Sequence, residues 1–260
     1  IMYLLRKMVL AGLLFSAGVN MFAQESAYAY DANGNLTKDL NKNIVDIQYN
    51  SLNLPSRIVF KNGDNISHVY SADGSKLRTV WVADGDTLTT DYCGNVIYEN
   101  GVPVRLMTDV GYIALSDTSY HYFIKDHQGN VRVVADEHGN AEEVNDYYAF
   151  GGLMSTSSRQ SVQPYKYNGK ELETACGVNW YDYGARRYDP VLGRWNGVDP
   201  LCEDYYSENP YGYCGNNPVN YVDPNGLMKV LYNPDGTYKE TTHNNWFHNT
   251  FMGRQEYIDY

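Results

Sequence analysis

The sequence predicts a mainly β protein built from antiparallel hairpins. Tyr supplies 26 of the 260 residues and Gly supplies 23, and this composition is typical of many short strands joined by tight turns. Apolar and polar residues alternate in short runs, as in residues 44–49 and 131–134, which is the pattern of half-buried strands. No long amphipathic helix is visible before residue 228. A chain of this length can hold one or two ordinary domains.

The amino end carries the features of a targeting segment. Arg6 and Lys7 precede a mostly apolar run from Met8 to Phe22, and Ala23 follows it. A short positive region, an apolar stretch and a small residue near the exit make a secretory signal. We therefore expect residues 1–23 to be a signal peptide and the mature protein to be secreted or held at the cell surface, with no stable membrane span. An uncleaved anchor stays open, although the run is shorter than the roughly 20 residues of a membrane helix.

Residues 28–150 contain loosely repeated turn units. Asp is first and Gly is fourth in residues 31–34, 126–129 and 136–139, which suits a type I turn followed by a left-handed residue. Asp31, Asn33 and Asn35 also stand at alternate positions, as calcium ligands do. However, Lys42 occupies the place where an EF-hand loop needs Glu. Turn chemistry is the better interpretation, and we expect no metal or other cofactor.

Three Asp-Pro steps, at Asp189, Asp199 and Asp223, punctuate the segment that follows. Each Pro fixes its own φ and holds the preceding Asp extended at a turn. Residues 218–227 fit the pattern P-x-x-x-x-D-P-x-G-L at every specified position. This stretch resembles the RHS repeat-associated core domain of the Rhs/YD-repeat family, and the turn units resemble its YD repeats. Residues 165–172, Y-K-Y-N-G-K-E-L, resemble the phrase that introduces the core.

The resemblance implies a domain order. Residues 28–150 would be degenerate YD-type β-hairpin repeats forming part of a spiral β-shell. Residues 165–227 would be the Rhs core, and residues 228–260 a short variable C-terminal tip. In this family the shell holds the tip peptide, as in polymorphic toxins, and a closed shell needs several hundred residues. This chain would supply one partial turn of it.

The resemblance also implies a site. Some members of the family cut themselves after the boundary motif by an aspartic-protease-like mechanism that uses an Arg and two Asp. The matching positions are Arg186, Asp199 and Asp223, and the cut bond would be Leu227–Met228. Paired carboxylates suit this chemistry because one stays ionised while the other holds a proton, and Arg186 would lower the pKa of one of them.

A plain structural interpretation stays open beside this one. The Asp residues could only start turns, with Asp189 the clearest case, and Arg186 and Arg187 could pair with surface carboxylates. Arg187 stands where the family commonly has an aromatic residue, so it could compete for a carboxylate of the site.

The cysteines and the tail carry weaker signals. Four Cys in an exported chain allow three pairings; nothing selects one, although a Cys202–Cys214 bridge is open, and no zinc-type spacing occurs. Residues 229–232 and 238–241 could form a last hairpin. His243 and His248 suggest a nuclease-like metal site, but 33 residues bury little core and an i, i+5 pair does not share a helix face.

The leading functional interpretation is a non-enzymatic one. The chain would be a secreted scaffold or carrier, a shell fragment of an Rhs-type polymorphic toxin or surface-interaction protein. The alternatives are a self-cleaving core that releases the tail after Leu227, and an adhesive repeat protein with exposed Tyr. The net charge of −11 argues against nucleic-acid binding by the shell. The expected partners are other Rhs segments, an immunity protein or a cell-surface partner.

Overall fold

One long antiparallel sheet dominates the computed structural model, which describes residues 26–158, 162–204, 206–232 and 238–241. Thirteen strands follow one another in sequence order, each paired with the strand before and after it. Their bounds are β1 Tyr28–Tyr30, β2 Leu36–Asp39, β3 Ile44–Tyr49, β4 Pro55–Phe60, β5 Asn65–Tyr70, β6 Lys76–Ala83, β7 Asp86–Cys93, β8 Val96–Glu99, β9 Val102–Thr108, β10 Gly111–Ala114, β11 Tyr120–Lys125, β12 Val131–Asp136 and β13 Ala141–Val144. The predicted fold class, mainly β with stacked hairpins, is confirmed.

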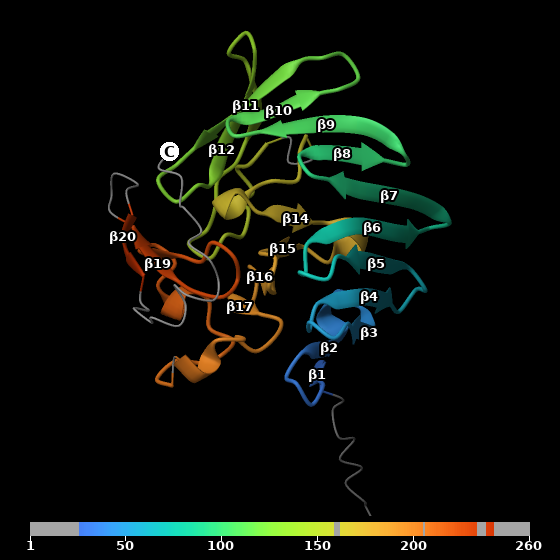
Figure 1. Cartoon of the computed structure of the whole chain (residues 1–260), viewed down its shortest axis with the longest axis vertical. Helices are drawn as coiled ribbons and strands as arrows, with labels where there is room; N and C mark the ends of the chain where they lie inside the picture. The colour runs from blue at the N-terminus through green and yellow to red at the C-terminus, as the bar shows by residue number, and fades with distance from the viewer. Residues whose placement is uncertain (1–25, 159–161, 205, 233–237, 242–260) are drawn as a thin grey trace, which may run out of the picture.

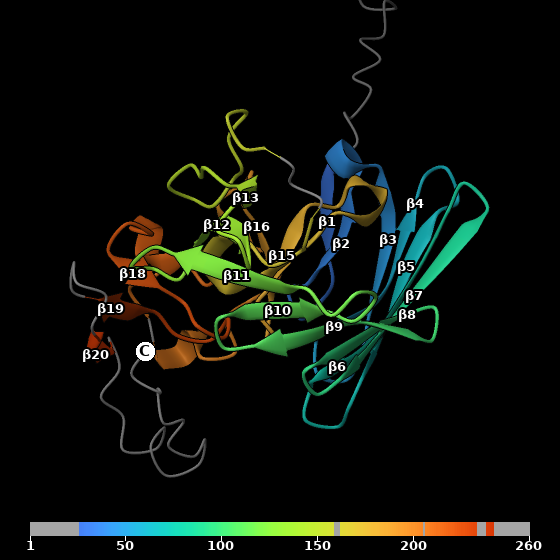
Figure 2. The same ribbon diagram turned by 90° about the horizontal axis from the view of Figure 1, so that it is seen from above.

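The long sheet curves around a second, smaller group of strands (Figure 1). A four-stranded sheet lies on its concave side and contains β14 Glu171–Glu173, β15 Trp180–Asp182, β16 Arg187–Asp189 and β17 Arg194–Trp195. The view from above shows the same arrangement, with β18 to β20 beyond the core (Figure 2). These last strands, β18 Tyr221–Val222, β19 Val230–Tyr232 and β20 Tyr238–Thr241, form a third sheet, and β19–β20 is the hairpin expected from the sequence.

Short 3₁₀ turns are the helical segments among the described residues. They are η1 Leu40–Lys42, η2 Tyr167–Gly169, η3 Ala175–Gly177, η4 Cys202–Asp204 and η5 Cys214–Asn216. Within the described ranges, no helix has the length and apolar character that crossing a membrane requires. The expected signal peptide, residues 1–23, lies outside those ranges.

The Asp–Gly units form the turns that their chemistry predicts. The Gly34 N–H donates to the Asp31 carbonyl at 3.1 Å, and Gly34 has a φ of 79°. The Asp31 carboxylate accepts N–H groups from Asn33 at 2.9 Å and from Asn35 at 2.8 Å. The same backbone bond closes the turns that begin at Asp126 and Asp136. The Asp31 carboxylate is therefore used by the turn, while the side chains of Asn33 and Asn35 donate to Asn53 Oδ1.

Aliphatic side chains join the long sheet to the core. Ile44, Ile47, Ile58 and Ile66 are fully or almost fully buried, and they belong to one cluster with Trp180 of β15. These isoleucines come from β3, β4 and β5, so the concave face of the sheet supplies the aliphatic half of the interface. Burial of this apolar surface fixes the core against the sheet.

The abundant Tyr fills the interior of the core. Tyr167, Tyr181, Tyr183, Tyr188, Tyr213 and Trp195 pack in one buried cluster. The Tyr183 and Tyr213 hydroxyls each lie 2.7 Å from the Asn168 side-chain oxygen. A buried Tyr brings apolar area together with a hydroxyl that needs a partner, which is why this cluster is ordered by hydrogen bonds as well as by packing.

Asp189, of the first Asp-Pro step, is a structural residue in this fold. It is 0% exposed and accepts the Trp180 indole N–H at 3.0 Å and the Val191 N–H at 2.8 Å. The Lys42 ammonium of η1 lies 3.3 Å from Asp189 Oδ2, the oxygen that also accepts the Trp180 N–H. The carboxylate therefore ties the long sheet to the core, as the structural interpretation of this step expects.

Gly34 marks a close approach between the long sheet and the core. A Cβ at this position would lie 2.6 Å from Val198 and 2.7 Å from the Tyr211 hydroxyl. That hydroxyl donates to the Gly34 carbonyl at 2.7 Å. Gly63 offers a matched comparison because it has a φ of 95° and nothing within 4 Å of its Cβ position.

We expect Gly34→Ala to destabilise the chain more than Gly63→Ala. Both variants force Ala into the left-handed region, at a cost of about 1 kcal/mol each, but only Gly34→Ala adds overpacking, worth about 1–3 kcal/mol. Urea unfolding followed by tryptophan fluorescence measures the difference. Equal losses in the two variants would show that the sheet and the core do not meet closely at Gly34.

Candidate functional site

Two adjacent arginines, Arg186 just before β16 and Arg187 at its first position, point to different parts of the molecule. Arg187 pairs with the half-buried Asp182 and donates to the Tyr70 hydroxyl at 3.1 Å, so it faces the long sheet. Arg186 faces Asp199 and Asp223 instead. Successive residues of a strand point to opposite faces, which accounts for the separation. Arg187 therefore does not compete for the carboxylates of the site.

Arg186 brings the two predicted carboxylates together. Its Nη2 lies 2.8 Å from Asp199 Oδ2 and 3.7 Å from Asp223 Oδ2. The guanidinium also donates to the Pro210 carbonyl at 3.2 Å and lies 4.2 Å from the centre of the Trp195 ring. These partners hold the planar cation in one orientation. The alternative in which Arg186 pairs with surface carboxylates does not fit this geometry, since its side chain is 4% exposed.

The boundary motif closes around the same arginine. Arg186 Nε donates to the Gly226 carbonyl at 2.5 Å, and the Asp223 Oδ1 atom accepts the N–H groups of Gly226 at 2.7 Å and Asn225 at 3.1 Å. Gly226 has a φ of 81°, and a Cβ there would lie 3.1 Å from the backbone nitrogen of Arg186. Glycine is required at this point for both reasons. The Asp223 turn thus holds the backbone just before Leu227 against Arg186.

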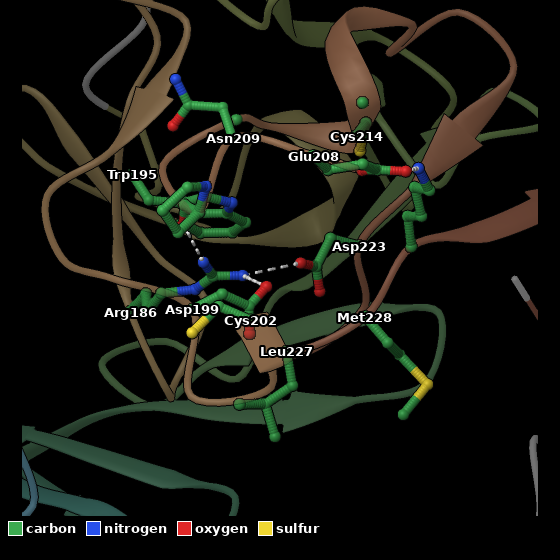
Figure 3. Close-up of a pocket in the computed structure, with 14 residues that line it drawn as sticks. Arg186, Trp195, Asp199, Cys202, Glu208, Asn209, Cys214, Asp223, Leu227 and Met228 are labelled. Carbon is green, nitrogen blue, oxygen red and sulfur yellow. Dashed lines mark hydrogen bonds and ion pairs between the residues drawn. The ribbon is translucent and has the colours of Figure 1, made fainter. Parts of the chain in front are cut away.

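Leu227 and Met228 line the same cavity as the three charged residues. Figure 3 shows the Asp199 and Asp223 side chains converging on the guanidinium, with Leu227 and Met228 at the edge of the site. The cavity volume is about 30 Å³, which is room for a water molecule among polar partners. The arrangement therefore places two carboxylates, a cation and space for water beside the predicted bond.

Burial controls the protonation of this site. It raises the pKa of Asp223 to about 6, against the opposing effects of Arg186 and of the Gly226 and Asn225 N–H groups. Burial also raises the pKa of Asp199, although Arg186 and the Leu201 N–H oppose it. The expectation that Arg186 lowers a carboxyl pKa is thus overridden by desolvation. Asp223 is 3% exposed, and a pKa of about 6 leaves it partly protonated near neutral pH.

Several groups of this site had no role in the sequence analysis. Trp195, Pro210 and Glu208 all line the cavity. Trp195 lies in the G-R-W phrase just before Asp199. The one signal in the sequence that could have pointed to Trp195 was the presence of an aromatic residue near a motif Arg. Cys202 and Cys214 line the cavity as free thiols, so the open alternative of a Cys202–Cys214 bridge is not realised. Cys214 is buried on η5 and Cys202 lies on η4, and they reach the cavity from different sides (Figure 3).

The described ranges contain no group of three or more His, Cys, Asp or Glu that could hold a metal ion. His243 and His248, which suggested a metal site in the tail, lie outside those ranges.

No protein-family model matches the sequence. Salivary gland surface protein 1 of Aedes aegypti is 29% identical over 233 residues, which is 80% of this chain and 7% of that protein. The tRNA3(Ser)-specific nuclease WapA of Bacillus spizizenii is 28% identical over 76% of this chain and 8% of its own length. Toxin subunit YenC1 of Yersinia entomophaga is 36% identical over 43% of this chain and 12% of its own length.

Solved structures share the fold. A Tc holotoxin pore from Photorhabdus luminescens matches with a TM-score of 0.64 and 21% identity, covering 81% of this chain and 11% of that one. The crystal structure of TcdB2-TccC3 without its hypervariable C-terminal region matches with a TM-score of 0.62 and 21% identity, over 76% of this chain and 11% of that one. This chain therefore spans only about a tenth of the length of the proteins that it resembles.

Proposed function

Because this chain is related to the Rhs/YD-repeat proteins, we propose that it is a secreted shell segment of a toxin whose core cuts its own chain after Leu227. The curved 13-stranded sheet supports the carrier part, since it wraps one side of the core. β1 and β13 end this sheet, and further hairpins of other toxin segments would pair at such edges.

One observation carries the self-cleaving part. Arg186 Nη2 lies between Asp199 and Asp223, and the same guanidinium binds the Gly226 carbonyl immediately before Leu227. Neither a turn-forming role nor a surface ion pair explains why the buried Asp223, the half-buried Asp199 and a buried cation meet at the boundary motif. A buried charge cluster costs desolvation free energy, and functional sites are where such clusters concentrate.

The reaction follows from the two protonation states. Asp199, 2.8 Å from the Arg186 cation, is the base that takes a proton from water as the water oxygen attacks the Leu227 carbonyl carbon. Protonated Asp223 is the acid that gives its proton to the Met228 nitrogen as the Leu227–Met228 bond breaks. The products are a carboxyl group on Leu227 and an amine on Met228. In catalysis of this kind, two carboxyl groups in different environments generally act as the acid and the base.

This assignment predicts a pH dependence. The acid form of Asp223 dominates below its pKa of about 6, so cutting is expected to speed up roughly tenfold from pH 7 to pH 5, in proportion to the protonated fraction. At lower pH the rate is expected to fall again as Asp199 gains a proton. Uncut chain purified in denaturant, refolded by dilution at each pH and quenched for intact-mass measurement gives the rates.

Tryptophan fluorescence of the same samples follows refolding separately from cutting. A rate that stays constant between pH 5 and pH 8 in folded protein would show that Asp223 is not the acid.

A further inference from the structure

The chain that follows the proposed cut is held firmly by the core. Val230, three residues beyond Leu227, is 0% exposed and pairs with Val222 of β18. Leu231 pairs with Tyr221 in the same ladder. Asp223 follows directly after β18, so the strand that holds the departing segment leads straight into the proposed acid.

Lys229, two residues beyond the proposed cut, lines the same cavity as Arg186, Asp199 and Asp223, together with Glu208 and Gly215. Its ammonium pairs with Glu208 and lies 5.4 Å from the centre of the Tyr221 ring. A Cβ on Gly215 would lie 2.8 Å from the same ammonium. Only 13% of the Lys229 side chain is exposed. A long cationic side chain fits this place, because Glu208 supplies an anion, Tyr221 an aromatic face and Gly215 the space that a side chain would fill.

We propose that Glu208, Tyr221 and Gly215 form a recognition subsite for the Lys at position 229, and that Glu208 is a positioning residue for the cut. This inference rests on the proposed function. With Val230 anchored on β18, the subsite fixes the register of the departing segment and so places the Leu227–Met228 bond beside Asp223. The core therefore requires a cation two residues after the bond and a small branched apolar residue three residues after it.

Charge reversal tests this requirement. Glu208→Lys and Lys229→Glu each place like charges together and are expected to slow cutting by at least about two- to fivefold, the loss that follows from removing a partly exposed ion pair. The double variant Glu208→Lys/Lys229→Glu is expected to regain most of the wild-type rate. Glu203→Lys makes the same charge change at an exposed position of η4 and is expected to keep the wild-type rate.

A second readout does not depend on cutting. In an Asp223→Asn chain, added Glu208→Lys is expected to speed amide hydrogen exchange in residues 229–232 by a similar factor, and Lys229→Glu is expected to restore protection in the presence of Glu208→Lys. Hydrogen-exchange mass spectrometry of the full chain measures this.

The two readouts separate the possible failures. A wild-type chain that is never cut would end the proposed function, while the exchange data would still decide whether Glu208 holds the segment. A wild-type chain that is cut, with both single variants cut equally fast and exchange unchanged, would overturn the subsite and leave the cut standing.

Discussion

Asp223→Asn is expected to leave the chain uncut. The amide cannot donate the proton that the Met228 nitrogen needs, and loss of a general acid costs about 10²- to 10⁴-fold in rate. The Asn oxygen can still accept the N–H groups of Asn225 and Gly226 that Asp223 Oδ1 accepts now, so the turn should survive. Asp199→Asn is expected to stop cutting as well, because it removes the base. Intact-mass measurement of the purified variants checks both.

Arg186→Ala is expected to slow the reaction because it unpairs the two carboxylates. Asp109→Asn is the matched control, since Asp109 is exposed in the turn between β9 and β10, and it should be cut at the wild-type rate. Cutting at Leu227–Met228 in both Asp223→Asn and Asp199→Asn would refute the two-carboxyl mechanism.

The Asp223→Asn variant should also be the more stable protein at neutral pH. The pKa of Asp223 is about 6 in the folded chain against an ordinary value of 3.8, so the folded state binds more protons between these values. Stability therefore falls as pH rises through that window and stays low above it. Removing the carboxylate would return up to about 3 kcal/mol at pH 8 and nothing at pH 3.

Glu143→Ala is expected to cause the largest loss of stability among single changes outside the site. The Glu143 side chain is 0% exposed and lies 2.5 Å from the Lys166 ammonium, which is 2% exposed. Gln163 and Asn145 also donate to the same Glu143 oxygen. Burial lowers the pKa of Lys166 even with its partner present. Removing the carboxylate leaves a buried cation without its partner, while the two amides keep only their bonds to the Val131 and Tyr165 carbonyls. The expected cost is about 3–5 kcal/mol.

Urea unfolding measures that loss, and two variants bracket it. Glu137→Ala removes an exposed carboxylate after β12 and is expected to change stability by less than about 0.5 kcal/mol. The double change Glu143→Leu/Lys166→Met removes both charges and is expected to recover most of the loss. A Glu143→Ala chain as stable as wild type would show that this pair is not buried in solution.

The sequence predicts the parts of this fold that local chemistry decides. The Asp31, Asp126 and Asp136 turns depend on a carboxylate, a few neighbouring N–H groups and a glycine, all within five residues. The alternation of apolar and polar residues along a strand likewise depends only on neighbouring residues. The pairing of Glu143 with Lys166 is different because 23 residues separate them, and no periodic pattern links the two.

The candidate site also has parts that the sequence predicts and parts that depend on the fold. Matching motifs to a family identified Arg186, Asp199 and Asp223, and the fold brings these three together. Arg186 lowers the pKa of both carboxyls, as predicted, but burial raises their pKa values by more, and the sequence pattern does not show how deeply Asp223 is buried. The separate paths of Arg186 and Arg187 likewise depend on which face of β16 meets the long sheet.

The intact mass of the purified wild-type chain, measured after refolding at pH 6, tests the central claim most directly. The account predicts two fragments, a large one that ends at Leu227 and a tail that begins at Met228, both lost in Asp223→Asn. A folded chain that stays whole, or that is cut at any other bond, would contradict it.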